Sequence, residues 1–346
     1  MKPSLIHLLY LQFSKPPPVP RIDLAGKNVV VIGASTGIGL EAAKHFATMN
    51  PARLILGCRD ATRGEAAAAR IVRETEFKNV EVWLIDLTDF ASVSAFAERY
   101  ETEGGRLDIL VENAAIIPTA GQKMTKDGWE PTLQTNNLAT SLLGLLLVPR
   151  MLETAEKFRT LPRLVVVASG LHYLGKLEDR VVDAANPFQV LGAENYYDFN
   201  ISKNRTARYT ETKILNVLFA RALASRIEGK SVVVNSVDPG YCKSELRRSY
   251  QGIFSFTNWL MDTIFALTSE QGSRQLIWAS VGRTPGDEEI DLNGTFISFM
   301  SVWEPSDFVV DEKGQKIQEK HWENLVEELE KVNPKVRQIV DQYLSH

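Results

Sequence analysis

The chain has 346 residues, of which 44% are hydrophobic and 24% are charged, with 39 basic and 43 acidic side chains. This composition suits a globular protein with a sizeable core, and it excludes a disordered or collagen-like chain. The formal net charge of −4 indicates no basic surface for nucleic acid. Two cysteines and five histidines, without a C-x-x-C or H-E-x-x-H pair, predict neither a disulfide framework nor a metal site.

The N-terminal segment is the one candidate in the sequence for a targeting or membrane element. Residues 4–13 are mostly apolar, but the run is shorter than the ~20 residues that a spanning helix needs. The proline-rich stretch 15–20 follows as a stiff connector. Residues 1–24 are therefore interpreted as an arm, either a short helix docked on the domain or an interfacial membrane anchor. The protein is predicted to be cytoplasmic and without a transmembrane segment.

Six short apolar runs are predicted to be strands buried on both faces, because they are nearly continuous and rich in β-branched residues. They cover residues 28–33, 53–58, 80–86, 107–113, 163–169 and 231–237. Helix-like stretches lie between them, among them 37–49, 61–77 and 138–158. This alternation predicts an α/β fold with a doubly wound parallel sheet in a single domain.

Two regions interrupt the alternation. Residues 170–208 join a strand to a helix through a stretch that is longer than a connector requires, and residues 241–268 follow another strand end. Open α/β sheets bind ligands at the carboxyl ends of their strands, so both regions are expected to line a substrate pocket. The second region carries Tyr250, Phe254, Phe256, Trp259, Leu260, Phe265 and Leu267. These side chains favour a bulky lipophilic substrate, with simple packing between helices as the alternative.

The tail from residue 304 onward predicts an amphipathic helix that closes the domain, since apolar side chains recur at helical spacing. These positions are Trp322, Leu325, Val326 and Leu329. The predicted organisation is an N-terminal arm over 1–24, a main domain over 25–303 and a C-terminal helical tail over 304–346.

A glycine-rich turn follows the first predicted strand directly and leads into a helix. Glycines permit a tight turn and close backbone approach, so a pyrophosphate can lie on the N–H groups of the helix N-terminus. The predicted cofactor contacts here are Gly33, Ser35, Thr36, Gly37, Ile38 and Gly39. The spacing G-x-x-x-G-x-G differs from the usual dinucleotide fingerprint, and plain turn chemistry is the alternative.

The end of the second predicted strand indicates which dinucleotide binds. NAD-specific folds of this kind place an acidic residue there for the ribose 2′-hydroxyl, whereas this chain has Arg59. A guanidinium suits a 2′-phosphate, so NADP(H) is the predicted cofactor. An arginine that only caps the strand in solvent, with Asp60 beside it, is the alternative.

Tyr209 and Lys213 form the strongest candidate for a catalytic pair. Positions i and i+4 share one face of a helix, so both side chains can point into one pocket. A free tyrosine has a pKa of ~10, and a neighbouring ammonium stabilises the phenolate and lowers that pKa toward working pH. This is the condition for general acid or base catalysis. A pair on the protein surface is the alternative.

Several motifs occur together in the order that is typical of the short-chain dehydrogenase/reductase family. They are the glycine turn, Asp86-Leu87, Asn113-Ala114-Ala115, Asn136, Ser169, Tyr209-x-x-x-Lys213, and Pro239-Gly240 followed by Ser244. Residues 25–300 resemble this family, and CRDATRGEAAA and GTFIS resemble its retinol dehydrogenase and WW-domain oxidoreductase branch. The segments PGYCKSEL and EPSDFVVDEKGQKIQEKHWENL resemble fungal members linked to secondary metabolism. The resemblance implies a Rossmann-type fold and makes the main domain an NADP-binding catalytic domain.

The resemblance implies a role for each matching catalytic residue. Tyr209 would donate a proton to a carbonyl, and Lys213 would lower the pKa of that tyrosine and bind the nicotinamide ribose. Ser169 would hold the substrate oxygen, and Asn136 would support a proton-relay water. His172 lies just beyond Ser169 and is interpreted as structural, with substrate contact as the alternative.

The resemblance also implies three further cofactor contacts. Asp86 would receive the adenine amine, Asn113 would lie near the adenine ribose, and Ser244 stands where a threonine is expected near the nicotinamide amide. The motif N-N-A-G begins with Glu112 in this chain. The larger departure is the 40 positions between the serine and the tyrosine, which makes the substrates of relatives a poor guide.

The predicted function is NADP(H)-dependent hydride transfer between the nicotinamide and a lipophilic ketone, aldehyde or secondary alcohol. A tailoring step in fungal secondary metabolism is the predicted setting. A catalytically silent NADP-binding regulator is the main alternative, and glycine spacing disfavours an epimerase or dehydratase. The expected partner is a small lipophilic molecule, with neither nucleic acid nor metal, and a homo-oligomer is left open.

Overall fold

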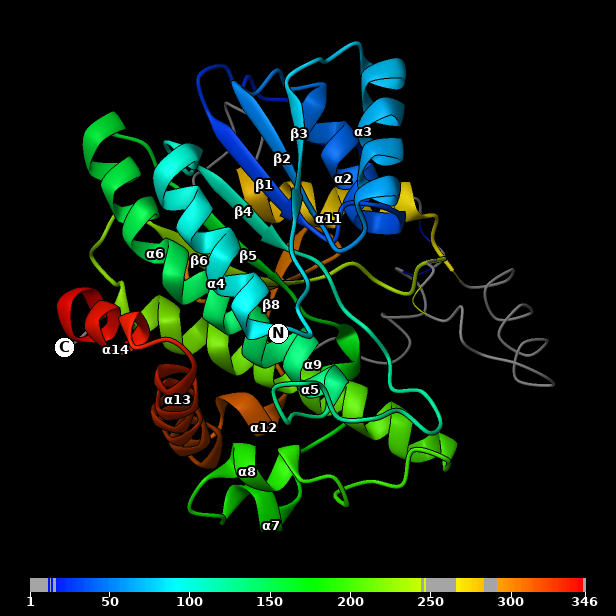
Figure 1. Ribbon diagram of the computed structural model, residues 1–346, viewed down its shortest axis with the longest axis vertical. Coiled ribbons are helices and arrows are strands. Elements are labelled where there is room, and N and C mark those ends of the chain that lie inside the picture. Colours follow the sequence, from blue (N-terminus) through cyan, green and yellow to red (C-terminus); the bar gives the residue numbers. More distant parts are fainter. Residues whose placement is uncertain are drawn as a thin grey trace.

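The computed structural model of the chain describes residues 12, 14, 17–243, 246, 266–282 and 291–344 (Figure 1). Within them, eight strands form one sheet in the order β3-β2-β1-β4-β5-β6-β7-β8. The strands are β1 (Asn28–Ile32), β2 (Arg53–Cys58), β3 (Val80–Leu84), β4 (Ile109–Glu112), β5 (Arg163–Val167), β6 (Val233–Asp238), β7 (Phe296–Ser298) and β8 (Ser301–Trp303). Neighbours from β3 to β7 pair in parallel, and β8 pairs with β7 antiparallel.

Long helices cover both faces of this sheet (Figure 1). One face carries α2 (Gly37–Ala47), α3 (Ala61–Thr75) and α11 (Ser269–Val281), and the other carries α4 (Phe90–Arg99), α6 (Ala139–Phe158) and α9 (Ser202–Arg226). Shorter helices are α5 (Pro131–Leu133), α7 (Asp179–Val182) and α8 (Pro187–Gly192), and the tail forms α12 (Asp307–Val310), α13 (Glu312–Val332) and α14 (Lys335–Ile339). Helical turns of other types are η1 (Tyr100–Gly104), η2 (Gln134–Leu138), η3 (Gly170–Tyr173) and η5 (Val340–Leu344).

The central strand β1 shows why the sheet is covered twice. Val29 and Val31 are fully buried against the side of α2 and α3, whereas Val30 and Ile32 are buried against the side of α4 and α6. Side chains alternate across a strand, so an unbroken apolar run needs a helical layer on each face. The predicted doubly wound, Rossmann-type sheet is confirmed. Because β1 lies between β2 and β4, the strand order reverses there and opens a crevice at the carboxyl edge.

Several predicted strands extend too far at their carboxyl ends. The strand predicted over 80–86 ends at Leu84, and the strand predicted over 163–169 ends at Val167. The apolar pattern continues past these points, but the chain leaves the sheet there to form turns that carry polar site residues. The antiparallel strand β8 is not predicted, because a three-residue run at a sheet edge has little apolar pattern.

The predicted closing helix of the tail is three helices rather than one. Asp311 begins α13 by accepting a hydrogen bond from the backbone N–H of Gly314, and Asn333-Pro334 ends it. The predicted apolar stripe is buried as expected, at Trp322, Leu325, Val326 and Leu329. It packs against the core that α6 and α9 share. The domain boundaries after residues 24 and 303 stay predictions.

One helical stretch of the described residues, Pro131–Phe158, is long and apolar enough to cross a membrane. Of its most apolar window, 78% is buried inside the fold. The stretch is therefore interpreted as a core helix, because most of its apolar window is covered by protein.

Candidate active site

A cavity of about 930 Å³ opens at the carboxyl edge of the sheet. Its walls include the ends of β1, β2, β4, β5 and β6 and the inner face of α9. Among the predicted site residues it is lined by Gly33, Ser35, Thr36, Gly37, Ile38, Arg59, Asp86, Asn113, Ser169, Tyr209 and Lys213. Gly39 and Asn136 lie behind the wall, and Ser244 lies outside the described residues. The topology thus brings together residues that are as far apart in sequence as Gly33 and Lys213.

The turn between β1 and α2 requires glycine. Gly33 has φ +80°, and a Cβ atom there would lie 2.8 Å from Cα of Ala114. A Cβ at Gly39 would clash with the carbonyl oxygen of Gly33 and would lie 2.5 Å from Nδ2 of Asn113. The missing side chains leave the N-terminus of α2 open to the cavity. That cradle fits a dinucleotide pyrophosphate, which the N–H groups of the helix end would bind.

Asn113 braces this turn from the neighbouring strand. Its Nδ2 donates a hydrogen bond of 3.1 Å to the carbonyl oxygen of Gly33. Asp86, at the end of β3, accepts hydrogen bonds from the backbone and hydroxyl of Thr88, at 2.9 and 2.7 Å. Both side chains also line the cavity, so they support the shape of the cofactor half as well as facing it.

Arg59 is exposed at the end of β2 and lines the same half of the cavity, together with Arg63. Asp60 also lines this part of the cavity, and its carboxylate caps α3 by accepting a 2.8 Å hydrogen bond from the backbone N–H of Arg63. Two guanidinium groups and one carboxylate therefore border the cavity on this side. A 2′-phosphate fits such a surface better than a free 2′-hydroxyl does.

Tyr209 and Lys213 lie on α9 and both face the cavity, so they are not a surface pair. The ammonium of Lys213 is 1% exposed, lies 5.5 Å from the ring centre of Tyr209 and donates a 2.7 Å hydrogen bond to the carbonyl of Val167. Burial lowers the pKa of Lys213 to about 7, against the opposing effect of the Asp238 carboxylate. Both the charged and the neutral form of this lysine are therefore accessible near neutral pH.

Asn136 lies in the π-helical turn η2, which interrupts the entry to α6. Its amide oxygen accepts a 2.8 Å hydrogen bond from the N–H of Ile116, and its Nδ2 donates a 2.9 Å hydrogen bond to the carbonyl of the same residue. Nδ2 also donates a 3.1 Å hydrogen bond to the hydroxyl of Thr212. Turns of this type are frequent at functional sites. Here the side chain ties the segment after β4 to the helix of Tyr209 and Lys213. Its role with a relay water stays a prediction.

Ser169 lies two residues beyond the end of β5 and lines the cavity, and His172 contacts its backbone. Nε2 of His172 accepts a 3.2 Å hydrogen bond from the backbone N–H of Ser306, so Nδ1 carries the proton and donates to the carbonyl of Ser169, at 2.8 Å. Burial lowers the pKa of His172 to about 4, so the ring is neutral near pH 7. These contacts support the structural interpretation of His172, which joins the catalytic strand end to the tail.

Asp238 is a site residue that the sequence reasoning missed. It ends β6, lines the cavity and accepts hydrogen bonds from the backbone of Gly240, at 3.0 Å, and the hydroxyl of Ser298, at 3.1 Å. Burial raises its pKa, which Lys213 opposes. Its position directly before Pro239-Gly240, at a predicted strand end, was the available signal.

Both predicted loop regions contribute to the cavity wall, and their role in binding substrate stays a prediction. Residues 170–208 contribute Leu171, Tyr173, Leu174 and Thr206, and residues 241–268 contribute Tyr241, Cys242 and Leu246. Six of the aromatic and apolar residues named for the second region, all except Leu267, lie outside the described residues. The stretch after β4 was missed as a third wall, and it contributes Ile116, Ile117, Thr119, Gln122, Pro131 and Thr135. Its position at a strand's carboxyl end could have indicated it.

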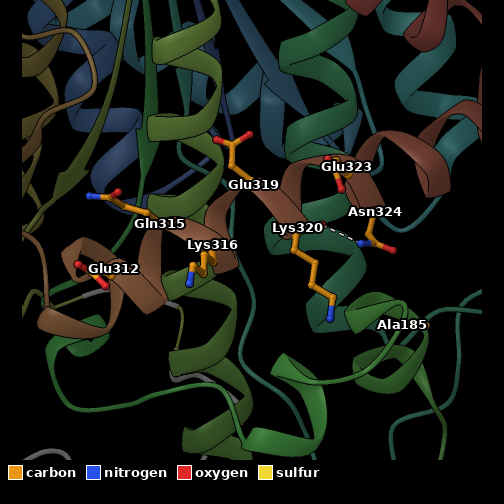
Figure 2. A pocket seen from close by; sticks show the side chains of 8 residues that line it. All are labelled: Ala185, Glu312, Gln315, Lys316, Glu319, Lys320, Glu323 and Asn324. Carbon is orange, nitrogen blue, oxygen red and sulfur yellow. Dashed lines mark hydrogen bonds between the residues drawn. The ribbon is translucent and has the colours of Figure 1, made fainter.

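A second hollow of about 850 Å³ lies along α13, and Figure 2 shows the side chains of this helix that line it together with Ala185. Its charged residues alternate in sign, as with Glu319 and Lys320, and none of them belongs to the catalytic constellation. This groove is a solvated face of α13, because most of the side chains that line it are exposed.

The sheet, the glycine turn at its switch point and the pair of half-buried Tyr209 and buried Lys213 define an oxidoreductase of the dinucleotide-binding α/β class. Residues 27–170 match the family model described as short chain dehydrogenase. The chain is 32% identical to the short chain dehydrogenase/reductase dmxR8 of a Cryptosporiopsis species, over 95% of this chain and 98% of that protein. The chain belongs to the short-chain dehydrogenase/reductase family and is an NAD(P)-dependent oxidoreductase.

Other relatives extend the comparison. The chain is 33% identical to the short-chain dehydrogenase anuD of Penicillium roqueforti, over 96% of this chain and 84% of that protein. It is 36% identical to human retinol dehydrogenase 12, over 73% of this chain and 72% of that protein. The Pseudomonas aeruginosa RhlG/NADP complex shares the fold, with a TM-score of 0.59 at 21% identity over 82% of this chain and 99% of that chain.

Proposed function

We propose that this enzyme uses NADP(H) to interconvert a lipophilic ketone or aldehyde and the corresponding alcohol. The main support is the convergence of Ser169, Tyr209 and buried Lys213 on one cavity whose remaining walls are largely apolar. Arg59 and Arg63 support NADP(H) over NAD(H). Similarity to fungal relatives supports a tailoring step in secondary metabolism, and we propose a cytoplasmic setting.

In the proposed reaction, the residues at the glycine turn would hold a nicotinamide cofactor, which would supply a hydride to the carbonyl carbon or accept one from the alcohol carbon. Ser169 donates a hydrogen bond to the carbonyl oxygen and orients it, while the Tyr209 hydroxyl gives that oxygen a proton as the carbon is reduced. The Lys213 ammonium stabilises the phenolate that remains, because opposite charges attract strongly in a buried site. The reverse reaction uses the same groups, with Tyr209 accepting the proton.

The test is turnover of NADPH with hydrophobic polycyclic and long-chain ketones, compared with small polar carbonyl compounds. The wild type is expected to prefer the hydrophobic group, and Tyr209→Phe is expected to lose about 10²- to 10⁴-fold in kcat with nearly unchanged NADPH affinity. Preference for small hydrophilic carbonyl compounds would contradict the substrate class. Absence of turnover by the wild type, with intact NADPH binding, would favour a silent regulator.

A further inference from the structure

A buried charge cluster lies behind the catalytic face of α9, on the side that the proposed reaction does not use. Its centre is Arg208, which directly precedes Tyr209 and is 0% exposed. Successive residues on a helix point about 100° apart. Tyr209 therefore faces the cavity while the guanidinium of Arg208 faces inward.

The guanidinium of Arg208 contacts two other segments and a carboxylate of its own helix. Its Nε lies 3.2 Å from Oε2 of Glu130, at the start of α5, and its Nη1 lies 3.2 Å from Oε2 of Glu211 on α9. Its Nη2 donates a 2.6 Å hydrogen bond to the carbonyl of Leu191 in α8. Nε and Nη1 make ion pairs without hydrogen-bond geometry, whereas Nη2 makes a hydrogen bond. A planar guanidinium presents several nitrogens to partners on different sides, which a single ammonium cannot do with the same spread.

Two tyrosines of the long Ser169–Tyr209 segment complete the cluster. The hydroxyls of Tyr196 and Tyr197 donate to Oε1 of Glu211, at 3.0 and 2.9 Å. Their rings lie 4.7 and 5.4 Å from the guanidinium carbon of Arg208, within cation–π range. The cluster thus connects the segment between Ser169 and Tyr209 to the N-terminal part of α9.

Through Glu130, the cluster is also connected to the turn that carries Asn136. Glu130 caps α5 by accepting hydrogen bonds from the backbone of Thr132 and Leu133, and α5 runs directly into the turn that holds Asn136. Glu130 also accepts a hydrogen bond from Gln122, which lines the substrate half of the cavity. A shift of Arg208 would therefore move two catalytic elements relative to one another.

We propose that Arg208 is a positioning residue, which holds the α9 segment of Tyr209 in register with Asn136 and with the cavity wall through Glu130, Glu211 and the Leu191 carbonyl. This proposal rests on the proposed function. A misplacement of about 1 Å at a catalytic group can cost about 10²-fold in rate. Arg208 thus contributes to the catalytic step without touching the substrate.

The test is Arg208→Lys, which keeps a positive charge but has one nitrogen for three partners. We expect kcat to fall by about tenfold or more, with NADPH affinity within about threefold of wild type. The primary isotope effect with NADPH deuterated at the transferred hydrogen should rise, since hydride transfer becomes slower relative to product release. An unchanged kcat and isotope effect would overturn the proposal.

Arg106→Lys is the matched control. Arg106 pairs with a buried carboxylate as Arg208 does, here in a bidentate contact with Asp108 at 2.6 and 2.7 Å, and it also lies over an aromatic ring. It precedes β4 at the opposite edge of the sheet. It should lower the thermal unfolding temperature and leave kcat within about twofold of wild type. Equal losses of kcat in both variants would indicate general destabilisation and overturn the proposal.

Two further measurements keep the proposal falsifiable. If Arg208→Lys fails to fold, the double variant Tyr196→Phe/Tyr197→Phe removes both hydroxyl donors and keeps the rings, and an unchanged kcat there would count against the proposal. Hydrogen–deuterium exchange over residues 202–213 should be faster in Arg208→Lys than in Arg106→Lys. Equal exchange in the two variants would overturn the proposal, and this measurement does not require a carbonyl substrate. The proposed function is tested separately, by comparing the activity of Tyr209→Phe with that of the wild type.

Discussion

At the scale of single residues, burial decides what Lys213 and Arg59 can do. Both are basic side chains near a cofactor cavity, but the ammonium of Lys213 is enclosed and the guanidinium of Arg59 is exposed. Enclosure strengthens the effect of the ammonium on Tyr209, whereas exposure leaves Arg59 free to meet a phosphate that enters from solvent.

Replacing Arg59 tests the choice of cofactor. The wild type should bind NADPH more tightly than NADH, and Arg59→Ala should lose about tenfold to a hundredfold in NADPH affinity, because a charge-assisted hydrogen bond contributes about 1.5–3 kcal/mol. NADH affinity should stay nearly constant. Titration of both cofactors measures this, with Arg73→Ala, an exposed arginine near the end of α3, as the control. Equal affinity of the wild type for both cofactors would refute the prediction.

Replacing Lys213 tests its burial through the pH dependence of stability. The folded pKa of about 7 lies below the ordinary value of 10.5, so between these pH values unfolding takes up a proton and the wild type gains stability as pH rises. Relative to Lys213→Met, the gain should approach about 1.4 kcal/mol per pH unit. Urea unfolding of both cofactor-free proteins across this range measures it. A constant difference between the two would contradict the burial of the charge.

At the scale of elements, the tail and the segment over residues 170–208 pack against the helix that carries Tyr209 and Lys213. Figure 1 shows α12 and α13 beside α9, with α7 and α8 next to them. The hydroxyl of Tyr173 donates a 2.6 Å hydrogen bond to the carbonyl of Glu304, so the serine-bearing segment is tied to the start of the tail. The tail therefore supports the site as well as the core.

Truncating one buried side chain of α13 tests this integration. Leu325 is 0% exposed, so Leu325→Ala should lower the free energy of unfolding by about 2–5 kcal/mol. Glu323→Ala, on the exposed face of the same helix, should stay within about 0.5 kcal/mol of wild type. Denaturant unfolding compares the two. Similar small effects for both would mean that the tail adds little to the fold.

At the scale of the whole molecule, two buried histidines make the stability of the fold depend on pH in the acid range. His172 bridges the catalytic segment and the tail, and His321 on α13 lies against Phe188 with neither ring nitrogen hydrogen-bonded within the described residues. Burial lowers the pKa of His172 to about 4 and that of His321 to about 3. Both rings are neutral in the folded protein at neutral pH.

The unfolded chain should take up these two protons first as pH falls. Unfolded histidines have a pKa near 6.5, so stability should decline from about pH 6.5 to pH 4, with a contribution of up to about 1.4 kcal/mol per pH unit from each ring. His321→Leu removes one titrating group and should reduce the steepness of the acid decline by about that amount. Urea unfolding at several acid pH values checks it. An unchanged acid dependence in His321→Leu would show that this ring is not buried in its neutral form.

The sequence by itself determined the alternating α/β layers, the glycine turn and the catalytic motif. Each of these depends on local chemistry: β-branched runs favour buried strands, glycine permits the positive φ at Gly33, and a four-residue spacing aligns Tyr209 with Lys213 on any helix. The functions of Ser169 and Asn136 came from the order of motifs, and their roles in the reaction stay predictions.

Only the tertiary structure decided which distant residues meet. Asp238, the wall after β4 and the Arg208 cluster join segments that are tens to hundreds of positions apart, and no periodicity along the chain records such contacts. The burial of Lys213 and His172 could likewise not be predicted, because the residue type alone does not tell whether a titratable side chain is exposed to solvent or buried. Burial and pairing depend on how whole layers pack, and packing is a property of the folded chain.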